Sequence, residues 1–157
     1  MDRIAANAES NKAQIYHYFG SKDALFDAVW ENLVAQITEQ APIDVDDLPG
    51  YGARLADSYA AHPDIARLIT WQRLERSDDP PHAFAVASTK SKVDELARAQ
   101  AEGHISDRFD ARVLLGLIIH LAAFWVTSSP DVLAVMGISA AKRRREIARE
   151  AIAALMT

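Results

Sequence analysis

The sequence predicts an all-α protein, with a partial helix-turn-helix head followed by a helical body. Half of its 157 residues are hydrophobic, glycine and proline are few, and no segment alternates apolar and polar residues as a strand does. Apolar residues recur instead every three or four positions, which is the pattern of amphipathic helices. The clearest example is Leu25, Phe26, Val29, Leu33 and Ile37.

The N-terminal helices are predicted from their capping residues. A helix over residues 2–8 is followed by a turn, and Asn11 is expected to cap a helix over residues 12–18, because an asparagine oxygen can accept a first-turn N–H. Gly20 then ends that helix and Ser21 caps the next one. This succession of short helices and tight turns predicts a helix-turn-helix.

A change of composition at residues 41–50 predicts the domain boundary. The segment holds two prolines, a glycine and three aspartates, residues that interrupt helices. We therefore expect a head and connecting helix over residues 1–40 and a larger helical domain over residues 41–157. The body helices are predicted at residues 50–61, 63–77, 80–102, 110–127 and 139–156, with a further short helix that starts at residue 129. Pro63, Pro80 and Pro81 are expected in first helical turns, which tolerate a missing N–H.

Composition and motifs exclude several classes of protein. The net charge of −5 argues against a basic coat over the whole surface, and the absence of cysteine excludes disulfides and cysteine-ligated zinc. The five histidines show no pairing at helical spacing, and no glycine-rich phosphate loop occurs. We expect no metal, no cofactor and no enzymatic activity.

The longest apolar run predicts a buried helix. Val113 to Val126 is interrupted by His120 and is shorter than the roughly 20 residues that a bilayer span needs. Because no signal peptide precedes the first helix, the chain is expected to be cytoplasmic, without a membrane partner.

The helix over residues 12–18 has one apolar side and one polar side. Ile15 and Phe19 lie four residues apart and can pack on Ile4, Ala5 and Ala8. A DNA-recognition helix must bury one side and present hydrogen-bond donors on the other. Tyrosines at helical spacing are usually core and lysines usually solvated surface, so Tyr16 or Lys22 taken singly indicates an ordinary structural role as readily as a DNA contact. The polar side carries Asn11, Lys12, Gln14, His17 and Tyr18, flanked by Tyr16 and Lys22, with two lysines and no carboxylate between residues 10 and 22.

These residues resemble the DNA-binding domain of the TetR family of bacterial transcriptional regulators. The resemblance covers residues 3–26 and is carried by Ile4-Ala5-Ala6-Asn7-Ala8, by Ile15-Tyr16-His17-Tyr18-Phe19, and by Gly20-Ser21-Lys22-Asp23-Ala24-Leu25-Phe26. It implies phosphate contacts from Tyr16, Tyr18 and Lys22, and base-edge or groove contacts from Lys12, Ala13, Gln14 and His17. With Asn11, these are the predicted DNA-binding residues.

The turn of the motif departs from the family pattern. Where the family has Gly-Val, this chain has Glu9-Ser10. The turn therefore lacks its permissive glycine, and the Glu9 carboxylate is expected to repel nearby phosphates.

The start of the chain also departs from the family. Family members begin with a further helix, so we expect an N-terminally truncated head in which Ile4, Ile15, Leu25 and Phe26 face water. The alternatives are a misassigned chain start and a genuinely headless regulator.

For the body, the resemblance implies a ligand-binding and dimerisation domain. A homodimer would form through residues 110–128 and 139–156. The predicted pocket residues are Tyr59, Trp71, Leu74, Phe84, Leu96, His120 and Phe124, with Tyr51 and Trp125 as further aromatic candidates. Their character favours a small hydrophobic or planar ligand. Plain packing is the alternative for each one, and a satisfied core position is the commoner role of a lone histidine such as His120.

The function that follows is a ligand-responsive DNA-binding transcriptional repressor, acting as a homodimer on a palindromic double-stranded operator. The basic run at residues 142–145 is interpreted as a solvated face, with a second nucleic-acid site as the alternative. A different class of function also fits: a dimeric small-molecule-binding or interaction protein that has lost DNA binding through its missing first helix.

Overall fold

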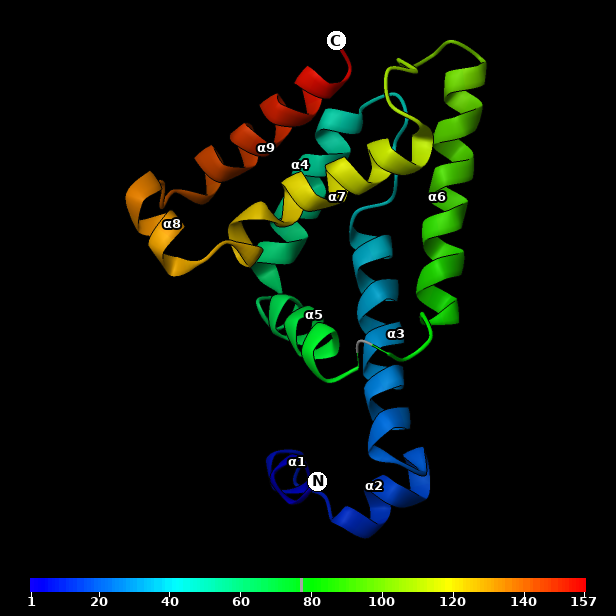
Figure 1. Ribbon diagram of the computed structural model, residues 1–157. Helices are drawn as coiled ribbons and strands as arrows, with labels where there is room; N and C mark the ends of the chain where they lie inside the picture. The colour runs from blue at the N-terminus through cyan, green and yellow to red at the C-terminus, as the bar shows by residue number, and fades with distance from the viewer. Residues whose placement is uncertain (77) are drawn as a thin grey trace. The chain divides into compact units, whose positions relative to one another are not determined.

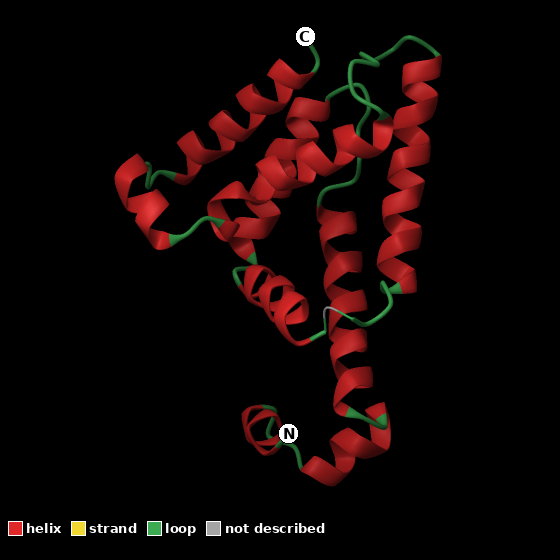
Figure 2. Cartoon of the chain, viewed as in Figure 1, coloured by secondary structure: helices red, strands yellow, loops and turns green. Residues whose placement is uncertain are grey.

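The computed structural model describes residues 1–76 and 78–157, which form helices joined by turns and loops (Figure 1). No strand occurs among these residues (Figure 2), so the predicted all-α fold is confirmed. The chain divides into two compact units, Met1–Ala35 and Gln36–Thr157, with the division inside α3. The helices are α1 (Asp2–Asn7), α2 (Lys12–Phe19), α3 (Lys22–Gln40), α4 (Leu48–Ala61), α5 (Asp64–Glu75), α6 (Ala83–Ala101), α7 (Ala111–Thr127), α8 (Pro130–Met136) and α9 (Ala141–Leu155).

The N-terminal unit has a small apolar core. Ala5, Ile15 and Phe26 are all buried, and the Phe26 ring stacks on Trp30 with centroids 6.1 Å apart. The expectation that Ile15 and Phe26 face water is therefore wrong, because α1 packs against α2 and Trp30 covers Phe26. Ile4 is exposed, as expected.

The body is built around α4, which packs against both α7 and α9, while α6 packs against α7. Figure 1 shows α7 crossing α4. This packing gives the body one continuous core, because the largest fully buried side chains come from all four helices. They are Leu48 and Tyr51 of α4, Leu96 of α6, Leu114, Leu115 and Ile118 of α7, and Ile152 of α9.

Pro63, Pro80 and Pro81 lie just before α5 and α6 rather than within their first turns. Helix α5 begins at Asp64, after Pro63, and α6 begins at Ala83, after Pro80 and Pro81. Pro81 disfavours helical backbone in Pro80, the residue before it, and His82, the N-cap of α6, is extended, with φ −62° and ψ 117°. The predicted start of α6 at residue 80 is therefore wrong. Helix α5 ends at Glu75, and residue 77, where its end was predicted, lies outside the described residues.

Helix α7 has the apolar character of a core helix. Among the described residues no single helix is long and apolar enough to cross a bilayer; α7 and α8 together reach that length, but the chain bends by 90° between them. His120, expected in the core, is exposed on α7, and its Nδ1 lies 2.8 Å from the carbonyl oxygen of Gly116. The expectation was wrong because residue 120 lies on the face of α7 opposite Ile118 and Ala122, which are buried.

Helices α4 and α9 approach closely at Gly52. A methyl group at this position would overlap the Cδ1 atom of Ile152, a side chain with no exposed surface. The absence of a side chain at Gly52 therefore permits the contact between these helices.

We expect Gly52→Ala to lower the free energy of unfolding by about 1–3 kcal/mol, although alanine favours the helix, because the new methyl group overpacks the core. Ile152→Val removes Cδ1 and should recover part of that loss in the double variant. Urea denaturation of the two single variants and the double variant measures the coupling. A stabilising Gly52→Ala substitution would contradict the close approach.

Two buried tyrosines of α4 predict sensitivity to alkali. Burial raises the pKa of Tyr59 from 10.0 to about 12, and burial together with Tyr59 raises that of Tyr51 further. A raised pKa means that the stability of the neutral phenol is fully present below pH 10 and is lost as the pH rises towards 12.

Tyr59→Phe should therefore reduce the loss of stability between about pH 10 and pH 12 by roughly 2–3 kcal/mol. Urea unfolding measured across this range, with simultaneous tyrosinate absorbance, tests the expectation. Identical pH profiles for the variant and the wild-type chain would show that Tyr59 does not titrate as a buried phenol.

Candidate nucleic-acid interface

Helix α2 is held at its start by a side-chain cap. The Asn11 Oδ1 atom accepts the backbone N–H of Gln14 at 2.8 Å, and the Ser10 hydroxyl donates to Gln14 Oε1 at 3.0 Å. The predicted cap is therefore present. It engages the side-chain oxygens, as acceptors, of Asn11 and Gln14, two of the predicted DNA-contacting residues.

The turn between α2 and α3 sets the position of Lys22. Gly20 has φ +74°, a conformation that favours glycine, and its N–H donates to the Tyr16 carbonyl at 2.8 Å. The Ser21 hydroxyl oxygen then accepts the N–H of Ala24 at 3.0 Å, as a helix cap does. Lys22 is the first residue of α3 and is therefore fixed next to the end of α2.

The predicted contact residues remain accessible. Tyr16 and Tyr18 are 42% and 78% exposed, and His17 packs edge-on against Tyr18 with ring centroids 5.6 Å apart. Exposed tyrosine hydroxyls can donate to phosphate oxygens. The structure thus places the predicted contact residues, most of which carry hydrogen-bond donors, on the exposed side of α2 and at the turn that follows it. The exposed set comprises Asn11, Lys12, Ala13, Gln14, Tyr16, His17, Tyr18 and Lys22.

Lys12 has a partner that the local sequence did not indicate. Its ammonium lies 3.3 Å from a carboxylate oxygen of Asp2, on α1, and this pairing lowers the pKa of Asp2. Both side chains are largely exposed, so the pair contributes little to stability. The pairing reduces the positive charge that the head offers, and a phosphate would have to compete with Asp2 for Lys12.

Glu9 lies in the left-handed region, with φ +48°. The Ser10 N–H donates to the Ala5 carbonyl at 3.0 Å and the Glu9 N–H to the Ala6 carbonyl at 3.3 Å. These are the two bonds of a Schellman motif, in which the residue at the position of Glu9 is usually glycine. A side chain in this conformation costs on the order of 1–2 kcal/mol.

Glu9→Gly should therefore stabilise the chain by roughly 1 kcal/mol and tighten DNA binding, because it removes both the strain and a carboxylate. Glu9→Gln removes the charge alone and separates the two effects. Thermal unfolding and duplex binding of both variants measure them. Equal stability of the glycine and glutamine variants would contradict the strain.

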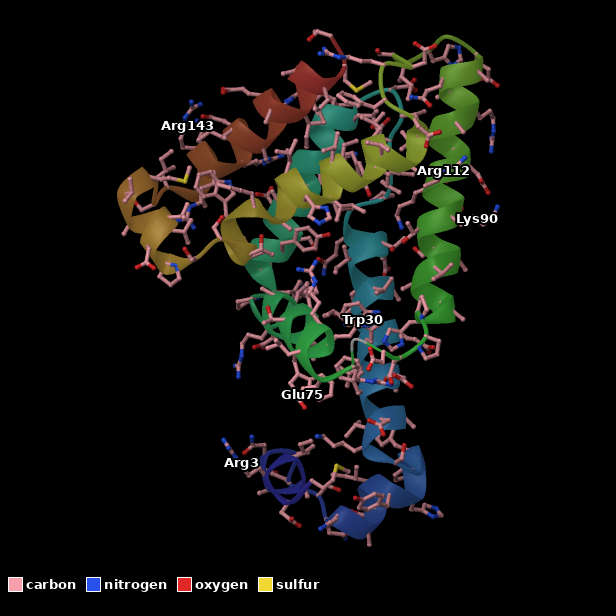
Figure 3. All side chains as sticks on the ribbon, viewed as in Figure 1. Arg3, Trp30, Glu75, Lys90, Arg112 and Arg143 are labelled. Carbon is pink, nitrogen blue, oxygen red and sulfur yellow. The ribbon has the colours of Figure 1, made fainter. Side chains whose placement is uncertain are left out.

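The basic run on α9 is largely paired with other groups. Arg143 contacts Glu146 and Glu150 at 3.5 and 3.0 Å, and Arg145 contacts Asp57 at 3.3 Å. The Arg144 Nε atom donates to the Ile138 carbonyl at 2.8 Å, with its guanidinium over the ring of Trp125. Figure 3 shows Arg143 extending from α9. This pairing supports a solvated face rather than a second nucleic-acid site.

The body contains an open groove of 760 Å³ beside α5. Two of the predicted ligand residues, Trp71 and Leu74, line it together with Leu68 and, from α7, Val126. Leu74 is 76% exposed, so the groove offers accessible apolar surface to a ligand.

The other predicted ligand residues do not line this groove. Tyr59 and Leu96 are buried in the core, as are Tyr51 and Trp125. Phe84 is exposed at the start of α6, while His120 and Phe124 are exposed on α7. Periodicity identified these side chains as apolar or aromatic but did not separate core positions from positions beside open space.

Comparisons with known proteins cover both units. Residues 1–29 match the family model described as bacterial regulatory proteins, tetR family, and residues 47–153 match the one described as tetracyclin repressor-like, C-terminal domain. The N-terminal match begins at residue 1, so the expectation that the first helix of the head is missing is not supported.

Two curated relatives carry the name HTH-type transcriptional repressor. SCO4008 of Streptomyces coelicolor is 35% identical over 138 residues, which cover 87% of this chain and 71% of that protein. NicS of Pseudomonas putida is 30% identical over 83 residues, or 48% of this chain and 39% of that protein.

A solved structure is similar over nearly the whole chain. The crystal structure of SCO4942 from Streptomyces coelicolor, named as a transcriptional regulator, superposes with a TM-score of 0.85 at 34% identity. The alignment covers 98% of this chain and 84% of that one. With both family models matched in order along the sequence, the chain belongs to the tetR family of bacterial regulatory proteins.

Proposed function

We propose that the chain is a DNA-binding transcriptional repressor that reads its operator with α2. The observation that carries the proposal is the geometry of this helix, which is capped at Asn11 and ended at Gly20, with Tyr16 and Tyr18 exposed. Lys22 begins the next helix after a tight turn. The names of SCO4008 and NicS as repressors support the same function. Tyr16, Tyr18 and Lys22 would contact phosphates, and Lys12, Ala13, Gln14 and His17 would face the groove. A repressor of this kind acts in the bacterial cytoplasm.

The proposed active form is a homodimer through α7 and α9. The outer side of α7 carries Val113 and Phe124, which are 52% and 36% exposed, together with His120. Exposed apolar side chains on a core helix favour a protein partner, and a second copy would supply one. Two recognition helices would then enter successive major grooves roughly 34–36 Å apart on a palindromic operator.

The proposed effector is a small hydrophobic molecule in the groove lined by Trp71 and Leu74. The groove's 760 Å³ lies within the usual range for small-molecule sites. Such a ligand would release DNA only if it favoured a conformation in which the two recognition helices no longer match the operator.

A salt titration of duplex binding tests the proposal. The DNA adjoining the chain's own gene is compared with a scrambled duplex of equal length, using the complete chain. Specific binding whose affinity falls as salt rises is expected, because phosphate contacts release counterions.

Equal binding to both duplexes, or none to either while a dimer persists, would favour a dimeric ligand-binding or interaction protein without DNA-binding activity. Two observations favour this second function. Asp2 pairs with Lys12, and Glu9 adds a carboxylate to the turn, so both reduce the attraction of the head for phosphates.

A further inference from the structure

A polar cavity lies between the last turn of α3 and the middle of α6. Its volume is 390 Å³, and it is separate from the apolar groove beside α5. Two apolar residues of the loop after α3 form part of its wall. The polar lining comes from Thr38 of α3 and from Ser88, Ser91, Lys92 and Glu95 of α6.

The ammonium of Lys92 is held in place at this cavity by neutral groups. Its Nζ atom donates to the Ser88 hydroxyl at 2.8 Å, to the Thr38 hydroxyl at 3.3 Å and, more weakly, to the Ser88 carbonyl oxygen at 3.5 Å. Burial lowers the pKa of this half-buried lysine, and the charge of Glu95 partly offsets that effect. No ion pair of Lys92 occurs within residues 1–76 and 78–157, so its charge is oriented but not neutralised by a direct partner.

Glu95 is in a similar position with the opposite charge. It lies three residues after Lys92, on the same side of α6, and is half-buried at the same cavity. In the part of the chain that the structure describes, its carboxylate forms neither a hydrogen bond nor an ion pair. Partly buried charges without a direct partner are costly, and both of these face one open space.

Lys90, unlike Lys92, has a carboxylate partner and is exposed to solvent. Lys90, two residues before Lys92, forms an ion pair with Asp94 at 2.7 Å, and its side chain is 72% exposed. Figure 3 shows Lys90 on the side of α6 away from the other body helices. Lys90 and Asp94, on the outer face of α6, therefore pair with each other, whereas the two charges at the cavity have no direct partner among the described residues.

We propose that this cavity binds a small zwitterion, whose carboxylate contacts Lys92 and the hydroxyls beside it and whose ammonium contacts Glu95. A ligand with both charges completes two ion pairs at once, while Glu95 would repel a simple anion and Lys92 a simple cation. The volume lies at the lower end of small-molecule sites. Because Thr38 belongs to α3, the bound molecule would contact the helix that continues into the N-terminal unit.

Isothermal titration calorimetry of the complete chain without DNA tests the site. The probes are the ω-amino acids from glycine to 6-aminohexanoate, with butyrate and butylamine carrying one charge each. We expect one member of the series to bind, and the two single-charge probes to bind at least about tenfold more weakly. Lys92→Met and Glu95→Gln should each weaken the best zwitterion about tenfold or more, whereas Lys90→Met and Asp94→Asn should leave it unchanged.

Circular dichroism melting of each variant separates loss of binding from loss of fold. The proposal is overturned if no member of the series binds, if butyrate binds as tightly as the zwitterion, or if the Lys90 and Lys92 variants weaken binding equally. Because no DNA is present, these outcomes are independent of whether the chain recognises an operator.

Discussion

Replacing both Tyr16 and Lys22 with alanine is expected to weaken operator binding by more than about 100-fold at physiological salt. Hydrogen bonds to a charged phosphate contribute about 1.5–3 kcal/mol each, and the double variant removes both from each head. Both residues are exposed, Tyr16 to 42%, so the substitutions should leave the fold intact.

The salt dependence identifies the role of Lys22. Loss of one phosphate contact per head should reduce the slope of log affinity against log salt by about two for a dimer. Fluorescence anisotropy with an operator duplex measures both the affinity and the slope. Tyr16→Phe isolates the hydroxyl, and Lys142→Ala is the matched control, since this exposed lysine lies on α9. If the double variant binds the operator as tightly as the wild-type chain, Tyr16 and Lys22 do not contact DNA.

The local elements of the head were predictable because each depends on neighbouring residues. Asn11 caps α2, Gly20 ends it with a positive φ, and Ser21 caps α3. Each of these signals acts within one helical turn, so a single sequence contains all the information needed. The strain at Glu9 was also predictable, because the family has a glycine at that position.

The electrostatics of the site were not predictable in the same way. The pair between Lys12 and Asp2 joins residues ten positions apart, and it depends on how α1 packs against α2. The cavity at Lys92 could not be predicted for the same reason, because the Thr38 hydroxyl that contacts Lys92 comes from a residue 54 positions away in the sequence. Spacing along a helix indicates which residues share a face, but tertiary packing decides what that face meets.

The ligand residues show the same limit at the level of burial. Trp71 and Leu74 line an open groove, whereas Tyr59 and Leu96 complete the core. All four are apolar or aromatic residues at helical spacing, and their difference arises from which neighbouring helix covers them. A hydrophobic pattern therefore predicts the core and a pocket equally well.

The second large effect is expected on the free energy of unfolding. Truncating a side chain on the buried side of α7 should lower it, whereas truncation on the exposed side should not. Ile118 has no exposed surface and lies among Leu114, Leu115 and Ala122, which are also buried. Ile118→Ala should lower the free energy of unfolding by about 2–5 kcal/mol, because the lost side chain leaves a cavity in a close-packed core. Urea denaturation at a fixed protein concentration measures the loss, since dimerisation makes stability depend on concentration.

Val113 provides the matched control, because it is 52% exposed on the same helix. Because Val113 also lies on the proposed dimer face, the comparison is made at protein concentrations low enough to keep the chain monomeric, where Val113→Ala should change stability by less than about 0.5 kcal/mol. If α7 forms the dimer interface, Phe124→Ser should instead weaken self-association in sedimentation experiments while the helical content stays the same. A Phe124→Ser chain that still forms the wild-type dimer would place the interface elsewhere, whereas a nearly neutral Ile118→Ala would contradict the packing of α7 against α4.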